Sequence, residues 1–344
     1  MWRAICMAGE EDDMQKVISV SGVSKVFTRG YFKKRYKLVL DDIKLEISEG
    51  DRLVIVGESG MGKTTLARIM ADLESPSGGE VLWFGQNIRS MAGADKKRLR
   101  GMVQYVHQDP YSSLHPAKTI FRIVADPLRN AQRIRGKELK EKVKELMEKV
   151  GLTPAEYFFN KYPHHLSGGG RQRLAIARAL TTDPRVIIAD EPISMIDMSL
   201  RAAIIKLFKD LNDQYNIAVV LVLHDIGAAK YFTYEKGEVA ILYGGKIVEM
   251  GEGAKVFANP LHPYTRVLIN SSPVADPQLA RNRVVEQLRS YEVPERTPES
   301  KGCPFAHACN HYLDRCMEEN PPLVAVEDNH LAACHLVHGR DGDG

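Results

Sequence analysis

The chain has 344 residues, of which 44% are hydrophobic and 26% charged, and 47 basic and 44 acidic residues leave a formal net charge of +3. This balance excludes a wholly disordered chain and lacks the concentrated basic character of a dedicated nucleic-acid binder. The longest apolar run, 217–223, is far shorter than the roughly twenty residues that span a bilayer, and the N-terminus turns acidic where a signal peptide is apolar. We therefore expect neither an integral membrane protein nor a secreted one.

Short apolar runs alternate with helical segments along most of the chain. Residues 17–86 mix β-rich runs with turns, and an amphipathic helix is predicted over 138–150, with Gly151 as its stop. Three further runs have the continuous apolar composition of strands buried on both faces: 53–56, 186–189 and 218–223. Together these patterns predict an α/β fold with a parallel sheet.

The first motif with chemical content follows the first of these strands, and it fits the phosphate-loop pattern G-x-x-x-x-G-K-[ST]. Its residues are Gly57, Glu58, Ser59, Gly60, Met61, Gly62, Lys63 and Thr64, and a helix follows from Thr65. The glycines let backbone N–H groups turn toward phosphates, and the helix directs its positive end at them. We expect Lys63 to reach the β and γ phosphates of ATP, and the Thr64 hydroxyl to ligate Mg²⁺.

Two carboxylates follow the second buried strand. Asp190 ends the strand, where it can hold the water shell of Mg²⁺, and Glu191 is placed to accept a proton from the attacking water. Such a pair is weak evidence alone, because helix-capping acids look the same. The phosphate loop upstream favours the catalytic interpretation.

The segment 166–170 reads Leu-Ser-Gly-Gly-Gly and opens a predicted helix. It resembles LSGGQ, the signature motif of the ATP-binding cassette (ABC) family. Ser167 and the amides of Gly168 and Gly169 would form an anion nest for a γ-phosphate presented by a second molecule. Gly170 stands where the family usually has Gln, which leaves open a weakened composite site.

The resemblance to ABC ATPases extends to four further positions. Gln108 resembles the Q-loop glutamine that senses Mg²⁺ and meets a transmembrane partner, and Asp197 lies in a segment like the D-loop. His224 resembles the switch histidine that contacts the γ-phosphate. Phe27 lies where the family stacks an aromatic ring on adenine, although other aromatic residues are close to it in the sequence.

The resemblance also implies a domain organisation. An ABC ATPase domain over 17–258 would combine a parallel-sheet phosphate-loop core, an antiparallel β subdomain and a helical signature subdomain at about 110–180. Prolines and weak periodicity after residue 258 predict a small cysteine-containing C-terminal extension over 259–338. Residues 1–16 and 339–344 are expected to be flexible termini.

Three stretches narrow the resemblance to the ATPases of oligopeptide and dipeptide importers: 108–116, 256–265 and 302–336. This branch implies a peripheral ATPase on the cytoplasmic face of the cell membrane, bound to two transmembrane permease subunits. It also implies a second ATPase, identical or related, in an ATP-sandwich dimer, and an extracytoplasmic substrate-binding protein as an indirect partner. The cargo stays open among peptides, oligosaccharides and nickel.

Four of the five cysteines fall close to the C-terminus with spacing C-x5-C-x6-C-x17-C: Cys303, Cys309, Cys316 and Cys334. Four thiolates suit either tetrahedral Zn²⁺ or a [4Fe–4S] cluster. Paired C-x2-C knuckles, which zinc ribbons favour, are missing, and some relatives in the importer branch are held to carry a [4Fe–4S] cluster here. The sequence favours iron–sulfur over zinc and leaves free thiols or two disulfides as alternatives.

Two other functions remain as alternatives to transport. A soluble ABC ATPase could act on chromosomes or ribosomes, but only 126 positions separate Thr64 from Asp190, too few for a long coiled-coil insertion, and the chain carries one cassette. A regulatory nucleotide binder would be compatible with Gly170. Glu191 and His224 argue against it, because they supply the groups that hydrolysis needs.

Overall fold

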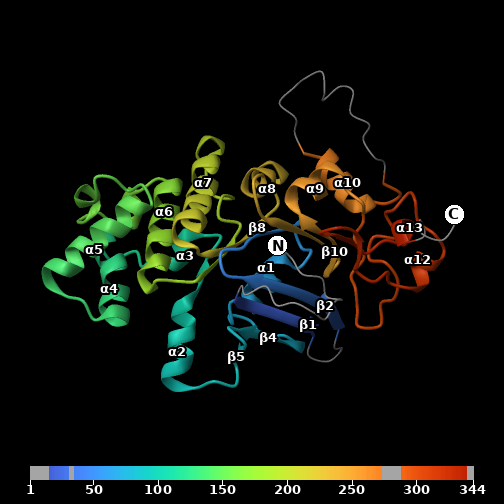
Figure 1. Ribbon diagram of the computed structural model, residues 1–344, viewed down its shortest axis with the longest axis horizontal. Helices are drawn as coiled ribbons and strands as arrows, with labels where there is room; N and C mark the ends of the chain where they lie inside the picture. The colour runs from blue at the N-terminus through green and yellow to red at the C-terminus, as the bar shows by residue number, and fades with distance from the viewer. Residues whose placement is uncertain (1–14, 31–34, 273–287, 339–344) are drawn as a thin grey trace.

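The computed structural model describes residues 15–30, 35–272 and 288–338. Figure 1 shows a central sheet with a second sheet beside it, a helical region at one end of the long axis and the C-terminal extension at the other. The predicted flexible termini fall largely outside the described residues, as does Cys6, and Lys16 already belongs to the first strand.

The smaller sheet is antiparallel and has the order β2-β1-β4-β5. Its strands are β1 (Lys16–Arg29), β2 (Arg35–Ser48), β4 (Gly78–Trp83) and β5 (Gln86–Asn87). Alternate side chains of β2, such as Ile43, Leu45 and Ile47, are buried, as expected for a sheet with one covered face. This sheet is the antiparallel β subdomain that the family resemblance implied.

The larger sheet has eight strands in the order β11-β12-β10-β9-β3-β8-β7-β6. Its first members along the chain are β3 (Arg52–Val56), β6 (Val103–Val106), β7 (Val186–Asp190), β8 (Ala218–Leu223) and β9 (Glu238–Tyr243), and these five are parallel. The antiparallel members are β10 (Lys246–Glu252), β11 (Val324–Glu327) and β12 (His330–Ala332). The three predicted buried strands are confirmed, and the sheet is mixed rather than wholly parallel.

Both faces of β3 are buried, which explains why its sequence does not alternate. Leu53 and Ile55 pack into the core shared with the antiparallel sheet, while Val54 and Val56 pack into a core shared with the helices. Each of these four side chains is at most 3% exposed. Burial on two faces fixes this strand firmly, and the loop that follows it therefore starts from a rigid base.

Helices cover the large sheet and form the region between β6 and β7. Around the sheet lie α1 (Lys63–Met70), α2 (Gly93–Met102), α7 (Met198–Tyr215) and α8 (Ile226–Thr233). The helical region contains α3 (Pro110–Ser113), α4 (Ile120–Gln132), α5 (Gly136–Lys149) and α6 (Gly168–Ala179), with 3-10 turns at Ala155–Phe158, Pro163–His165 and Leu180–Thr182. The helix predicted over 138–150 is confirmed as α5. No helix of the described residues is both long and apolar enough to cross a membrane.

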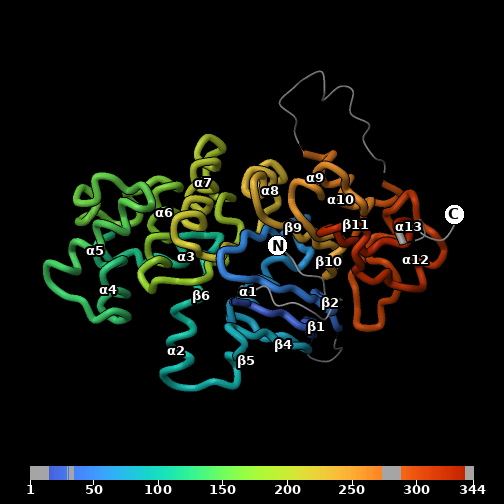
Figure 2. The backbone as a smooth tube through the Cα atoms, viewed as in Figure 1, coloured from blue at the N-terminus to red at the C-terminus, as the bar shows by residue number. Residues whose placement is uncertain are grey.

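The C-terminal extension returns to the large sheet instead of leaving it. Helix α9 (Gly253–Ala258) comes just before the extension, whose own short helices include α10 (Pro263–Asn270), α12 (Arg315–Glu318) and α13 (His335–His338). Strand β12 pairs with β10 and carries β11 on its outer edge, next to the hairpin of β9 and β10 (Figure 2). The sequence patterns predicted an extension here and missed these two strands, because each is only three or four residues long.

A buried carboxylate joins the extension to the sheet. Glu249 of β10 is fully buried, and its oxygens accept hydrogen bonds from the backbone N–H groups of Leu261 and His262, both at 2.8 Å. The Nε2 atom of His330, in β12, lies 2.7 Å from the same carboxylate. One side chain thus ties two separate segments of the extension to β10.

At the amino ends of the parallel strands, Glu238 begins β9 close to Asp51. Burial, and then the charge of Asp51, raise the pKa of Glu238 from its ordinary value of 4.5 to about 8. Between about pH 4.5 and 8, the folded chain therefore retains a proton on Glu238 that the unfolded chain has already released.

Because of this proton, the free energy of unfolding should fall as the pH rises through that window, by up to about 1.4 kcal/mol per pH unit. Glu238→Gln should flatten the pH dependence and stabilise the protein above pH 8. Urea unfolding of both proteins at several pH values checks this. Equal pH slopes for the two proteins would contradict it.

Candidate active site

The chemically distinctive residues gather where the parallel strands end. The phosphate loop follows β3, Asp190 and Glu191 lie at the end of β7, and His224 follows β8. Gln108 lies two residues after β6. The carboxyl edge of a parallel sheet is where ligands bind in open α/β folds, so the topology brings these predicted site residues together.

Glycines give the phosphate loop its shape. Gly60 and Gly62 have φ values of +84° and +102°, a region that other residues adopt only with strain. At Gly57 a β-carbon would lie 2.3 Å from the carbonyl oxygen of Leu242, so only glycine fits where the loop leaves the sheet. Ser59 and Glu58 are exposed at the tip, and Thr65 lies in the first turn of α1.

Lys63 is 4% exposed, and its Nζ atom donates to the carbonyl oxygen of Glu58 at 2.8 Å. Burial lowers the pKa of Lys63, and the nearby carboxylates of Glu191 and Asp190 oppose that shift. The ammonium group is thus held inside the loop with two acids in its field. An incoming polyphosphate would supply the stronger negative partner at this position.

Asp190 connects the loop to the sheet. The Thr64 hydroxyl donates to Oδ1 of Asp190 at 3.0 Å, and the Tyr105 hydroxyl donates to Oδ2 at 2.9 Å. Burial raises the pKa of Asp190. A hydroxyl and a carboxylate on adjacent elements are suitable ligands for hydrated Mg²⁺, so the donor set fits this ion.

Tyr105 was not among the predicted site residues. It lies in β6, three residues before Gln108, and orients the carboxylate of Asp190 through its hydroxyl group. The sequence offered only its nearness to Gln108 as a signal, because the contact depends on the pairing of β6 with β7.

The side chain of Glu191 contacts two other predicted site residues, Gln108 and His224. Its Oε2 atom accepts from Nε2 of Gln108 at 2.9 Å and lies 3.4 Å from Nδ1 of His224. The backbone of Glu191 has φ +44°, and its N–H donates to Val222 at 3.0 Å. The charge of the Glu191 carboxylate acts on Lys63, so this acid lies within electrostatic reach of the phosphate loop.

The predicted signature residues lie on another element. Ser167 caps α6, where its hydroxyl accepts from the N–H of Gly170 at 3.2 Å. Among the described residues no hydrogen bond or ion pair joins Ser167 to the phosphate loop. Gly168 approaches the segment before α7, since a β-carbon there would lie 2.9 Å from the carbonyl oxygen of Met195.

This segment leads to Asp197, which precedes α7 and is exposed. Met195 and Met198 beside it are 62% and 81% exposed. Apolar side chains at such exposure, next to the accessible end of α6, are typical of a protein–protein contact surface. One chain alone therefore does not bring the signature residues to its own phosphate loop.

The predicted adenine-stacking residue, Phe27, lies on β1 and is 37% exposed. The Nζ atom of Lys25 lies 4.8 Å from the centre of its ring. The ring is partly exposed near the end of β1, and its role in stacking on adenine stays a prediction.

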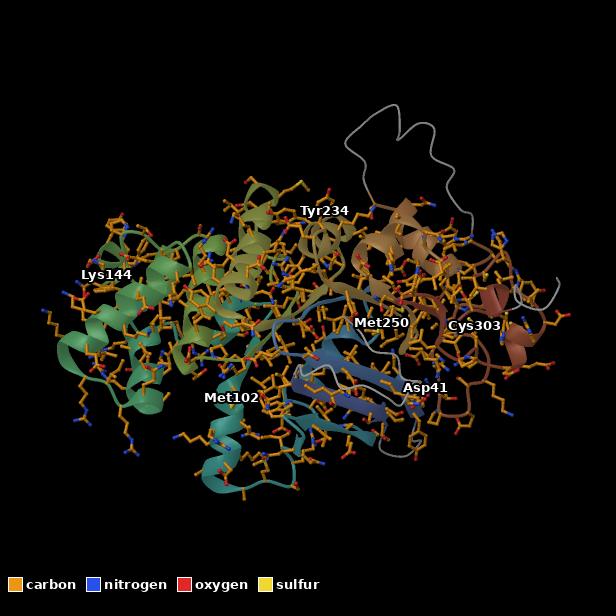
Figure 3. The ribbon with its side chains drawn as sticks, in the orientation of Figure 1. Asp41, Met102, Lys144, Tyr234, Met250 and Cys303 are labelled. Atoms are coloured by element: carbon orange, nitrogen blue, oxygen red, sulfur yellow. The ribbon has the colours of Figure 1, made fainter. Side chains whose placement is uncertain are left out.

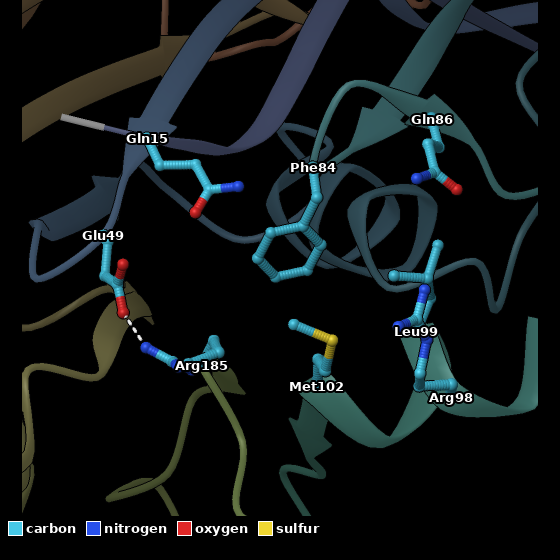
Figure 4. Close-up of a pocket in the computed structure, with 8 residues that line it drawn as sticks. All are labelled: Gln15, Glu49, Phe84, Gln86, Arg98, Leu99, Met102 and Arg185. Carbon is cyan, nitrogen blue, oxygen red and sulfur yellow. Dashed lines mark hydrogen bonds and ion pairs between the residues drawn. The ribbon is translucent and has the colours of Figure 1, made fainter. Parts of the chain in front are cut away.

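Several hollows lie among the residues that the structure describes, one of them, of about 410 Å³, beside Ser167 and Gly170 of the signature segment. A groove of about 480 Å³ lies between β6 and the helical region, and its walls include Arg100, His107 and Arg178. A smaller pocket of about 240 Å³ lies at the opposite, amino edge of the strands, where Glu49 pairs with Arg185 beside Phe84 and Met102 (Figure 4). The groove adjoins the residues that lead to Gln108.

The four C-terminal cysteines share one region, and Cys303 lies at the opposite end of the molecule from Lys144 in the helical region (Figure 3). They form no disulfide; Cys309, Cys316 and Cys334 are buried, and Cys303 is half-buried. Burial raises the pKa of Cys303 to about 12, and the charges of the other three thiols contribute to the shift. Among the described residues no three potential ligands are arranged to hold a metal ion.

Comparison with protein families gives two matches along the chain. The ABC transporter family model matches residues 40–194, and the model of the oligopeptide/dipeptide transporter C-terminal region matches residues 248–316. The first match includes the phosphate loop and Glu191. The second includes β10 and three of the four cysteines.

Curated relatives match almost the whole chain. The dipeptide transport ATP-binding protein DppF of Haemophilus influenzae is 37% identical over 96% of this chain and 100% of its own length. The oligopeptide transport ATP-binding protein OppF of the same organism is 36% identical over 89% of this chain and 91% of its own. The oligopeptide transport ATP-binding protein AppF of Bacillus subtilis is 36% identical over 94% of this chain and 98% of its own length.

Solved structures agree with the fold. The ATP-binding cassette MJ0796, in a dimeric post-hydrolysis state with ADP and Pi, has a TM-score of 0.61 and 30% identity over 68% of this chain and 98% of its own. The cbiO1 protein of Clostridium perfringens, part of the transporter complex cbiONQ, has a TM-score of 0.58 and 25% identity. The match covers 71% of this chain and 92% of cbiO1.

Proposed function

This chain belongs to the ATP-binding cassette family, in its oligopeptide and dipeptide transporter branch, and we propose that it is the ATP-hydrolysing subunit of a peptide importer. The observation that carries the proposal is the group formed by Lys63, Asp190 and Glu191 at the carboxyl edge of the sheet, in a chain that also has the transporter-type C-terminal region. The chain hydrolyses ATP as members of this family do, and it powers import through partners that span the membrane.

Each site residue has a defined part in hydrolysis. Lys63 and the loop amides would hold the β and γ phosphates, and Thr64 and Asp190 would hold Mg²⁺, which neutralises phosphate charge. Glu191 accepts a proton from the attacking water. Gln108 and His224, both beside the Glu191 carboxylate, orient that water and the γ-phosphate.

We propose that two cassettes sandwich two ATP molecules, so that Ser167 of one chain faces the phosphate loop of the other. The exposed Met195 and Met198 support this arrangement, since they border the signature helix. The sequence is compatible with an identical or a related second ATPase. Gly170, which lacks a side chain at the fifth signature position, favours a related partner that carries an intact signature. ATP binding closes the pair, and hydrolysis reopens it.

The groove beside β6 is the proposed docking site for a cytoplasmic segment of the permease. It is bordered by Arg100 and Arg178 and adjoins His107, the residue before Gln108. Because Gln108 follows His107 directly, movement of a bound segment would also move Gln108. The hydrogen bond between Gln108 and Glu191 would pass this movement on to Glu191. The protein would then lie on the cytoplasmic face of the membrane as a peripheral subunit.

We propose that the four C-terminal cysteines hold a [4Fe–4S] cluster, with Zn²⁺ as the second candidate. The four thiols share one region and fit such a group in number and softness. Their sulfurs must come closer together than they lie here to bind it. Anaerobic purification followed by iron, acid-labile sulfide and zinc analysis tests this: iron and sulfide in equal amounts support the cluster, and zinc alone contradicts it.

Affinity purification from native membranes tests the transport function. The tagged chain, extracted in mild detergent, should bring with it two permeases, a second ATPase and an extracytoplasmic binding protein, which can then be tested with peptides and oligosaccharides. Arg178→Glu, in the groove wall, should lose the permeases and retain the second ATPase. Recovery of ribosomes or DNA-bound complexes instead would contradict the transport function and leave the ATPase chemistry intact.

A further inference from the structure

The C-terminal extension places a side chain directly against the phosphate loop. Tyr264, in the first turn of α10, is 1% exposed, and its hydroxyl accepts a hydrogen bond from the backbone N–H of Glu58 at 2.9 Å. The two residues are 206 positions apart in the chain. The extension thus takes part in the structure of the nucleotide site.

The backbone of Glu58 is held from two sides. Its N–H is bound by Tyr264, and its carbonyl oxygen accepts from Nζ of Lys63 at 2.8 Å. Lys63 is also the side chain expected to reach the phosphates of ATP. Tyr264 is the second side chain on the Glu58 backbone and binds its N–H, not its carbonyl oxygen.

Tyr264 is itself fixed by an aromatic cluster. Its ring centre lies 4.4 Å from that of Tyr243, in β9, and 5.5 Å from that of Phe305. Phe305 lies between Cys303 and Cys309, is 2% exposed, and meets Tyr243 edge to face at 5.1 Å. The cysteine-bearing loop therefore supports the ring that anchors the phosphate loop.

A second link runs parallel to the first. Arg296 of the extension donates to the carbonyl oxygen of Gly244 at 2.8 Å, and the N–H of Gly244 points to the sulfur of Met61 at 3.4 Å. Met61 belongs to the phosphate loop. The extension therefore braces this loop at both Glu58 and Met61.

We infer that Tyr264 is a positioning residue that holds the phosphate loop in its nucleotide-binding conformation through its hydrogen bond with Glu58. The loop contains two glycines with positive φ, and such backbone gains many conformations when it is released. Holding it before the ligand arrives lowers the entropy cost of binding. This inference rests on the proposed binding of ATP by the same loop.

Tyr264→Phe tests the inference, because it removes one oxygen and keeps the buried ring. The Glu58 N–H then loses its partner, and we expect Mg-ADP and Mg-ATP to bind roughly fivefold to fiftyfold more weakly. The KM for ATP should rise by a similar factor, while kcat at saturating ATP stays within about twofold. Calorimetric titration of the purified chain measures the nucleotide affinity, and steady-state kinetics measure KM and kcat separately.

Tyr243→Phe is the matched control. Its hydroxyl lies 3.4 Å from Nε2 of His307, in the same cluster, and no hydrogen bond among the described residues joins it to the loop, so nucleotide affinity should stay within about twofold. Unchanged affinity in Y264F, or equal losses in both variants, would overturn the inference. A wild-type chain that binds no nucleotide would overturn the proposed function instead.

Thermal unfolding of both variants shows whether each is folded. Should Y264F not fold, Phe305→Leu replaces it: the hydroxyl stays, the support beneath the ring is lost, and nucleotide affinity should fall relative to Y243F. Equal affinities of F305L and Y243F would count against the inference.

Discussion

Glu191→Gln is expected to lower the rate of ATP hydrolysis by about 10²- to 10⁴-fold and to leave ATP binding intact. Glutamine keeps the size of the side chain but cannot accept a proton from water. The neighbouring groups of Gln108 and His224 stay in place, at 2.9 and 3.4 Å from the glutamate oxygen in the wild-type chain. The variant should therefore accumulate an ATP-bound dimer, which gel filtration with and without Mg-ATP detects.

Glu235→Gln is a suitable control for this substitution, since Glu235 is an exposed acid paired with Lys209 on the surface. It should hydrolyse ATP at the wild-type rate and show no trapped dimer. A Glu191→Gln variant with normal turnover would show that another group acts as the base. If the variant loses both ATP binding and ATP hydrolysis, Glu191 shapes the nucleotide pocket instead of acting as the base.

Glu249→Ala should produce the largest loss of stability, about 3–5 kcal/mol. The substitution leaves the N–H groups of Leu261 and His262 and the ring of His330 without their shared acceptor in a fully buried place. At about 2–4 °C per kcal/mol, the melting temperature should fall by roughly 10 °C. Calorimetry measures this, and hydrogen exchange at β12 should rise most, because that strand loses its anchor.

Glu252→Ala provides the comparison on the same strand. Its carboxylate is nearly half exposed and lies 3.6 Å from Lys255, so the expected change is below about 1 kcal/mol. The buried carboxylate is not the anchor of the extension if the Glu249→Ala variant has the same melting temperature as the wild type. The same conclusion follows if hydrogen exchange becomes faster over the whole chain and not mainly at β12.

Much of the nucleotide site could be predicted because its signals are local. A phosphate loop needs glycines and a lysine at fixed spacing, and the strands before it and before Asp190 are continuous apolar runs. The order of parallel strands then brings Gln108, Glu191 and His224 together without further information. The family resemblance supplied the roles of these residues, which spacing alone does not give.

The missed residues share one property: their roles depend on contacts between distant segments. Tyr105 looks like an ordinary strand residue until β6 pairs with β7. Glu249 looks like a surface acid in a strand, and its burial requires the extension to fold over it. Tyr264 lies in the stretch 256–265 that carries the resemblance to peptide importers, but its contact with the phosphate loop depends on the fold of the extension.

The contact between Tyr264 and Glu58 has a consequence for biosynthesis. A ribosome makes the phosphate loop about two hundred residues before it makes the tyrosine that braces it, and domains begin to fold from the N-terminus during translation. Until the extension emerges, a nascent cassette therefore lacks the hydrogen bond between Tyr264 and Glu58, and on the inference above its phosphate loop is unbraced.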